Sequence, residues 1–143
     1  MSKYAERAEL VPASLARREL AGHRGSPERW LRREIERTSN IALLQETVAL
    51  AWCVSIIELR APTRRCARVA FARQVAMYLG HVTFGLSLSA VGRHFGRDRT
   101  TAGYACRTIE DLRDDRHFDQ LLERLEIVLR VRQDRLNGEE AGQ

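Results

Sequence analysis

The 143-residue sequence lacks any long apolar segment. Its longest apolar stretch, residues 41–59, is interrupted by polar and charged side chains, whereas a membrane span needs roughly 20 apolar residues in a row. The first 20 residues carry acidic side chains and have no apolar core, so they do not resemble a signal peptide. We therefore expect a cytoplasmic protein with no membrane partner.

Cysteine pairs with metal-binding or redox spacing are also missing. The three cysteines, Cys53, Cys66 and Cys106, are odd in number and widely separated, and no C-x-x-C occurs. None of the four histidines stands at ligand spacing from a pair of cysteines. This pattern is typical of reduced thiols in a cytosol and predicts neither a disulfide framework nor a metal site.

Phosphate-binding and catalytic motifs are missing as well. The sequence contains no G-x-x-x-x-G-K-[ST], and its single lysine is Lys3, so no nucleotide-binding loop of that type is present. No nucleophile, base and orienting group can be argued for from the sequence. We expect no nucleotide, no other cofactor and no enzymatic activity.

Positive charge is concentrated in the middle of the chain. Residues 60–113 hold ten arginines and three acidic residues, residues 1–59 are close to neutral, and residues 114–143 are net acidic. A basic segment between less basic ends is typical of a site for a polyanion such as nucleic acid. The alternative is a solvated surface in a protein that uses arginine almost exclusively as its basic residue.

Helical periodicity dominates the sequence and predicts an all-α protein. Residues 1–25 are interpreted as a loosely helical or mobile arm, and Ser26, Asn40, Ser55, Ser87 and Asp98 are the expected helix N-caps. The expected helices cover residues 28–37, 41–53, 56–60, 69–82, 88–95, 99–113 and 117–136. The expected domains are an N-terminal arm and helix (1–40), a multi-helix domain (41–136) and a flexible tail (137–143).

The periodicity also predicts which side chains are buried. Apolar side chains of each main helix are expected to face the core: Val75, Met77, Leu79, Leu88, Val91, Phe95, Ala102, Ala105, Ile109 and Leu112. Arg73 and Gln74 are expected to keep their polar ends free. Four leucines of the last helix have two interpretations, a dimer seam or a cover for the core: Leu122, Leu125, Leu129 and Leu136.

The helices 88–95 and 99–113, joined by a short turn at Gly96, have the form of a helix-turn-helix. In that motif the first residues of the second helix meet base edges in the major groove. Asp98 is the expected cap, and Arg97, Arg99, Thr100 and Thr101 supply hydrogen-bond donors in or beside the first turn. The alternative is that these residues only cap the helix and solvate its surface.

The stretch from Arg73 to Leu112, "RQVAMYL…LSLSAVGRHFGRDRTTAGYACRTIEDL", resembles the C-terminal DNA-binding domain of the bacterial replication initiator DnaA. The order and spacing of the blocks match, and the similarity extends over residues 41–130. The resemblance implies an all-helical domain, preceded here by an N-terminal helical extension, whose helix-turn-helix recognises a short asymmetric duplex site. The initiator's ATP-dependent assembly is not carried over, because the nucleotide-binding loop is missing.

The resemblance assigns DNA contacts residue by residue. Arg73 and Gln74 match an Arg-Gln pair beside the recognition helix, and Arg65, with its neighbour Arg64, matches a basic loop that enters the minor groove. The remaining matches are phosphate contacts at Ser87 and Leu88 and the signature residues Asp98, Thr100 and Thr101. Three positions depart from the family pattern: Arg99 and Tyr104 replace two histidines, and Ser89 replaces a proline.

Together these observations predict sequence-specific binding to double-stranded DNA, association with the nucleoid, and regulation of transcription or of replication initiation. One alternative is a protein-interaction module that docks on replication proteins and binds little DNA. An RNA-binding role is less favoured, because the sequence lacks an aromatic platform for single strands. A homodimer or a replication-protein partner is compatible with the helices outside the helix-turn-helix.

Overall fold

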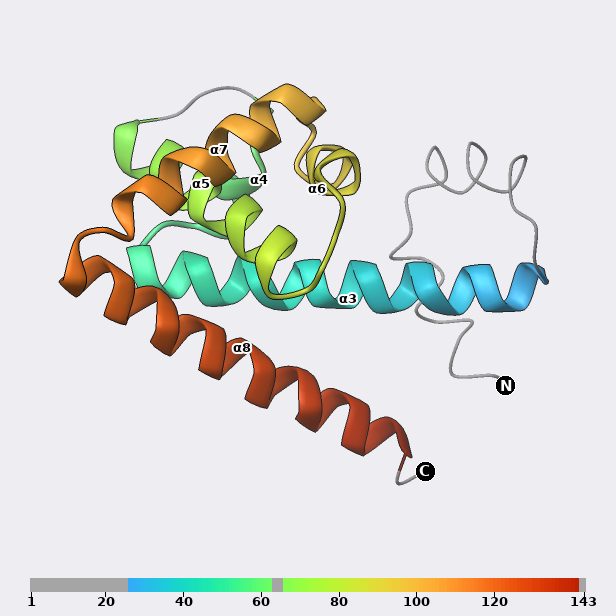
Figure 1. The fold of residues 1–143 in the computed structure, drawn as a ribbon. Coiled ribbons are helices and arrows are strands. Elements are labelled where there is room, and N and C mark those ends of the chain that lie inside the picture. The colour runs from blue at the N-terminus through green and yellow to red at the C-terminus, as the bar shows by residue number, and fades with distance from the viewer. Residues whose placement is uncertain (1–25, 63–65, 142–143) are drawn as a thin grey trace. The chain divides into compact units, whose positions relative to one another are not determined.

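The structure, a computed structural model, describes residues 26–62 and 66–141, and all regular secondary structure in these ranges is helical. The predicted all-α class is therefore confirmed for this part of the chain. The chain divides into two compact units, residues 1–41 and 42–143. Helix α3 (Pro27–Trp52) passes through the boundary, and the other described helices belong to the second unit (Figure 1).

Helix α3 is a single helix where the sequence predicts two. It begins as expected, because the Ser26 hydroxyl accepts the backbone N–H of Arg29 at 3.3 Å and Pro27 occupies the first helical position. The predicted second start at Asn40 is wrong, since the helix continues to Trp52. No glycine or proline lies after Pro27 in this helix, and an asparagine inside a helix costs only about 0.7 kcal/mol or less relative to alanine.

Helix α5 (Ala67–Val82) is the central helix of the second unit. It packs against α4 (Ile56–Arg60), α6 (Leu88–His94) and α7 (Arg99–Leu112). Every residue of α5 from Val75 to Gly80 is buried, which confirms the inward orientation predicted for its apolar side chains. A helix buried on all sides is expected at the centre of such a core.

Three short polar side chains begin the helices around α5, as the sequence predicts. Ser55 accepts the backbone N–H of Glu58 at 3.1 Å, and Ser87 accepts that of Ala90 at 3.1 Å. Asp98 accepts the backbone N–H of Thr101 at 2.7 Å. These are N-caps of the standard kind, and each satisfies a donor that the first turn of the helix leaves without a partner.

Helix α8 (Arg116–Ala141) closes the second unit and runs five residues beyond its expected end at Leu136. Three of the four leucines weighed as a seam are buried within this single chain, so they cover the core: Leu122, Leu125 and Leu129. Leu112, by contrast, was expected in the core and is 41% exposed. It is the last residue of α7, and the buried stripe of that helix ends one turn earlier at Ile109.

Aromatic rings and a long arginine hold α8 in place. Phe118 packs against Phe71 of α5 with tilted rings whose centroids are 5.8 Å apart, and Phe71 meets Trp52 of α3 edge-on at 6.0 Å. Further along α8, Arg132 donates from Nη1 to the Thr47 hydroxyl at 2.8 Å. The C-terminal part of α3 and the central helix therefore both contact α8.

The turn between α7 and α8 is fixed by Arg113. Its guanidinium donates to Asp119 at 2.5 Å, to Glu126 at 2.9 Å and to the Tyr78 hydroxyl at 3.0 Å. Tyr78 in turn donates to Glu110 at 2.8 Å, and partial burial raises the pKa of its hydroxyl. This network joins α5, α7 and α8 at the end of α7 opposite to Asp98.

In the described ranges no helix is long and apolar enough to cross a membrane.

Candidate nucleic-acid interface

Helices α6 and α7 form a tight helix-turn-helix through a close backbone contact. The backbone N–H of Arg97, in the turn, donates to the carbonyl of Gly92 at 2.7 Å. A Cβ atom on residue 92 would lie 2.6 Å from the Arg97 carbonyl oxygen, closer than folded chains tolerate. Gly96 supplies the other requirement of the turn, a left-handed backbone with φ +64°. The sequence marks Gly96 as a turn residue but gives no sign that residue 92 must be glycine.

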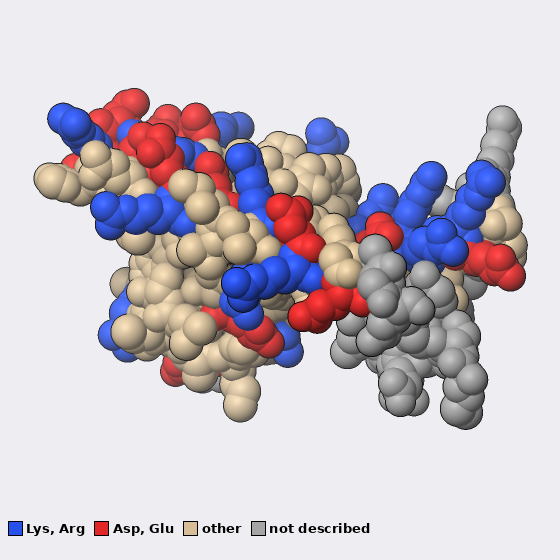
Figure 2. Space-filling view, turned by 90° about the horizontal axis from the view of Figure 1, so that it is seen from below, with Lys and Arg blue, Asp and Glu red and all other residues tan. Residues whose placement is uncertain are grey.

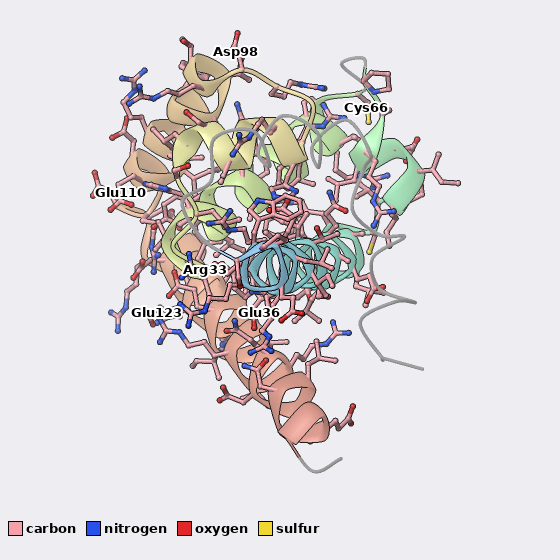
Figure 3. The ribbon with its side chains drawn as sticks, turned by 90° about the vertical axis from the view of Figure 1, so that its right-hand side faces the viewer. Arg33, Glu36, Cys66, Asp98, Glu110 and Glu123 are labelled. Atoms are coloured by element: carbon pink, nitrogen blue, oxygen red, sulfur yellow. The ribbon has the colours of Figure 1, made fainter. Side chains whose placement is uncertain are left out.

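The first turn of α7 presents its polar side chains to solvent. Ala102, Ala105 and Ile109 are fully buried on the side that packs against α5 and α6. Arg99, Thr100 and Thr101 are exposed, as the helix-turn-helix interpretation requires. Figure 3 shows Asp98 at the outer tip of this helix.

Asp98 acts as the cap of α7 rather than as a free acid. The backbone N–H of Thr101 and then its hydroxyl hold the pKa of the Asp98 carboxyl below its ordinary value. The carboxylate is fully exposed, yet its Oδ1 is engaged with the helix. An acidic group at this tip therefore sets the geometry of the first turn for the side chains that follow it.

Arg73 does not lie as the sequence predicts. Its side chain is 4% exposed, and its Nε and Nη2 donate to the carbonyls of Leu59 at 3.0 Å and Glu58 at 3.1 Å. The expectation of a free polar end is therefore wrong for Arg73. The guanidinium binds the last turn of α4, where the Glu58 carbonyl also accepts the backbone N–H of Ala61 at 3.2 Å. Gln74, the next residue, is half-buried.

Arg97 also turns inward in part. Its guanidinium donates to the carbonyls of Phe95 and Gly96 at 3.3 Å and of Ala61 at 3.4 Å, so it links the turn of the motif to the end of α4. Ser87 is used as the α6 cap, and Leu88 is partly buried between α6 and α7 near Gly103. The assignments of Arg64 and Arg65 lie outside the described residues.

The comparison with protein families gives one match on this region. Residues 41–109 match the family described as "Bacterial dnaA protein helix-turn-helix". This segment, slightly less than half of the chain, is thus similar to the DnaA helix-turn-helix family. The match includes α4 to α6, the turn and most of α7, so the resemblance drawn from the sequence blocks is confirmed.

Several curated relatives are similar over the same part of the chain. The "Chromosomal replication initiator protein DnaA 2" of Chlamydia muridarum is 41% identical over 71 residues, and DnaA of Lactococcus lactis subsp. cremoris is 42% identical over 76. DnaA of Azoarcus sp. is 40% identical over 78 residues. These alignments cover 50–54% of this chain but only 15–16% of each relative's length.

Helix α7 carries two further exposed side chains on its outward side. Tyr104 is 60% exposed and lies on the outward side of α7. Arg107 is also exposed and follows Thr100 by seven residues, which places it on the same face of the helix two turns later. Arg107 is not among the residues predicted from the sequence, because it lies beyond the first turn, although its i+7 spacing was the available signal.

Charge along this face changes sign. Arg99 and Arg107 occupy its first two turns and a half, whereas Glu110 and Asp111 stand near its end. Figure 3 shows Glu110 well separated from Asp98 along α7. A polyanion would therefore meet attraction at the N-terminal part of α7 and repulsion at its C-terminal part.

In the part of the chain that the structure describes, no group of three or more His, Cys, Asp or Glu residues could hold a metal ion.

Proposed function

We propose that this protein binds double-stranded DNA in a sequence-specific manner, with the N-terminal half of α7 in the major groove. The observation that carries the proposal is the exposed first turn of α7, held close to α6 by the contact between Arg97 and Gly92. The DnaA helix-turn-helix family supports DNA binding by this segment. The net charge of residues 60–113 supports a polyanionic partner.

The exposed residues of α7 divide into two roles in this proposal. Arg99, Thr100 and Thr101 face the base edges, where a guanidinium can donate to guanine and a threonine methyl can contact thymine. Tyr104 and Arg107 lie further along the same face and contact the groove edge or a phosphate. Phosphate contacts position the protein, whereas base contacts carry the specificity.

The residues outside α7 position the duplex. Ser87 and Leu88 stand at the start of α6 and contact a phosphate through the backbone, and Gln74 contacts DNA from α5. Arg64 and Arg65 enter the adjacent minor groove. Arg73 and Arg97 support these contacts indirectly, because both bind carbonyls at the end of α4, just before the segment that contains Arg64 and Arg65.

We infer the biological role of the protein from its relatives. The matched proteins are named chromosomal replication initiator proteins, which favours control of replication initiation over control of transcription. The rival function is docking on a replication protein with little DNA binding. The outward side chains of the first turn of α7 favour DNA, because they are polar and basic rather than apolar.

Binding to a pool of random duplexes, followed by affinity measurement on the enriched site, tests the proposal. Thr101→Ala should weaken binding to that site by roughly 1–3 kcal/mol, the usual scale of one base-directed contact. Arg130→Ala is the matched surface control, since Arg130 is exposed on α8. If no sequence is enriched, and if Thr101→Ala binds like the unchanged protein, the protein-docking function is favoured instead.

A further inference from the structure

Helix α8 has an exposed apolar stripe beside its buried one. Its members are interspersed with the buried leucines in the sequence and keep about half of their surface: Leu121 41%, Ile127 59%, Val128 44% and Val131 50%. Contiguous exposed apolar side chains on one helix are typical of an interaction surface. We call this set of four residues the α8 stripe.

An acidic–basic pair of side chains stands on each side of the centre of the α8 stripe. Glu123 and Arg124 precede its centre, and Asp134 and Arg135 follow it. Between these two pairs lie the exposed Arg130 and two residues already paired within the chain, Glu126 and Arg132. All four members of the two acidic–basic pairs are exposed. Among the residues that the structure describes, none of the four takes part in an ion pair within its own chain. They are therefore available to a partner.

We propose that the α8 stripe binds a second copy of this chain, with the two α8 helices antiparallel and the two-fold axis level with Leu129. In that register Arg124 of one copy stands level with Asp134 of the other. Arg135 stands level with Glu123 of the second copy, and Ile127 stands level with Val131. Each basic group then meets an acidic one at both ends of the stripe.

The charge order selects this occupant and this direction. In a parallel pair each charge would lie beside its own counterpart, arginine against arginine and aspartate against aspartate, which is unfavourable. Figure 2 shows that acidic and basic side chains stand beside one another on the face it presents, with uncharged surface between them. Self-complementary surfaces of this kind form the isologous contacts of two-fold dimers.

The dimensions of α8 allow such a contact without covering the recognition helix. The helix has 26 residues and is therefore about 39 Å long, and the stripe with its charges occupies about 20 Å of it. The C-terminal half of α8 leads away from α6 and α7 (Figures 1 and 3). If the proposed DNA binding holds, the dimer presents two α7 helices related by a two-fold axis and prefers two sites in inverted orientation.

Sedimentation equilibrium of the full chain without DNA tests the dimer directly. The unchanged protein should show a monomer–dimer equilibrium across a concentration series, and Val128→Glu should leave only monomer. Ile57→Glu is the matched control, because Ile57 is 83% exposed on α4 and the same substitution there should not alter association. A protein that is monomeric at every concentration, or an equal effect of both variants, would overturn the proposal.

Charge reversal tests the antiparallel register. Arg124→Glu and Asp134→Arg should each weaken association roughly tenfold, since each replaces two attractions with two repulsions. The double variant should restore the original association, because the pair is re-formed with its signs exchanged. Single variants that associate like the unchanged protein, or a double variant that stays weak, would show that the register is wrong.

A single-site duplex separates this inference from the proposed function. Below the concentration at which the protein dimerises, the α8 variants should bind such a duplex as tightly as the unchanged protein. Thr101→Ala should bind the duplex more weakly but keep its dimerisation. If the unchanged protein binds its site specifically but forms no dimer, the α8 contact is contradicted. If it forms the dimer but binds no site specifically, the proposed function of α7 is contradicted.

Discussion

The backbone N–H of Arg97 lies 2.7 Å from the carbonyl oxygen of Gly92, and this contact depends on the missing side chain at residue 92. A Cβ atom there would face backbone atoms of both Arg97 and Asp98 within 3.0 Å. Backbone cannot move aside as the end of a flexible side chain can. The separation of α6 and α7, and with it the position of the Asp98 cap, is therefore set by a glycine inside a helix.

Gly92→Ala is expected to destabilise the protein by roughly 1–3 kcal/mol, the usual cost of overpacking. Alanine is the better helix former, so helix propensity alone would give the opposite sign. Urea unfolding followed by circular dichroism measures the difference. DNA binding should also weaken, because the start of α7 must shift to relieve the contact with Arg97.

Gly103→Ala is the matched control for that substitution. It also lies inside a helix, but an added Cβ atom would meet only the end of the Leu88 side chain at 3.7 Å. Stability should rise by roughly 0.5–1 kcal/mol, the usual gain when alanine replaces glycine inside a helix. If both alanine variants are stabilised, the close contact at residue 92 does not restrict the side chain there.

Arg73→Ala is expected to lower the free energy of unfolding by roughly 2–4 kcal/mol, because it removes the charged donor from the buried carbonyl of Leu59 and the partly buried carbonyl of Glu58. Thermal unfolding measures this loss. Gln74→Ala, at the neighbouring half-buried position, should change stability far less. A stable Arg73→Ala protein with weak DNA binding would instead make Arg73 a direct contact.

The sequence predicted the helix-turn-helix and its caps because their signals are local. Ser55, Ser87 and Asp98 each bond to a backbone N–H three residues on, and such pairings are visible in the order of residues alone. The end of α8 and the continuity of α3 past Asn40 were not predicted, because polar residues are compatible with both helix interiors and helix ends.

The role of Arg73 and the requirement for Gly92 depend on tertiary contacts that no local pattern records. Arg73 bonds to carbonyls 14 and 15 residues away, on a different helix. A charged side chain on a helix is ordinarily predicted to be exposed to solvent, and for Arg73 that prediction fails because its guanidinium is buried. In the sequence, Gly92 cannot be distinguished from any other small residue on the buried side of a helix. Only the fold shows that the turn between α6 and α7 passes directly over it.

Asp98→Ala should destabilise the protein most at neutral pH. Because the folded-state pKa of Asp98 lies below its ordinary value of 3.8, the ionised cap contributes stability above that value and loses it as the pH falls through the folded-state pKa. The difference in urea midpoint between the two proteins should therefore shrink between pH 5 and strongly acidic conditions, roughly pH 2. A difference that is constant over this range would assign the effect of Asp98 to its geometry and not to its charge.

Arg99→His tests how this chain differs from the DnaA pattern that it otherwise follows. Neutral imidazole has one donor and one acceptor, whereas the guanidinium is a forked and permanently charged donor. In the major groove such a fork matches the O6 and N7 acceptors of guanine, so the unchanged protein should favour guanine at the base that Arg99 faces. Arg99 is exposed in the first turn of α7, where it can also bend toward a phosphate. Selection from a random duplex pool with both proteins distinguishes the two contacts. A change in the enriched base identifies a base contact, whereas an unchanged sequence with a shallower salt dependence for Arg99→His identifies a phosphate contact.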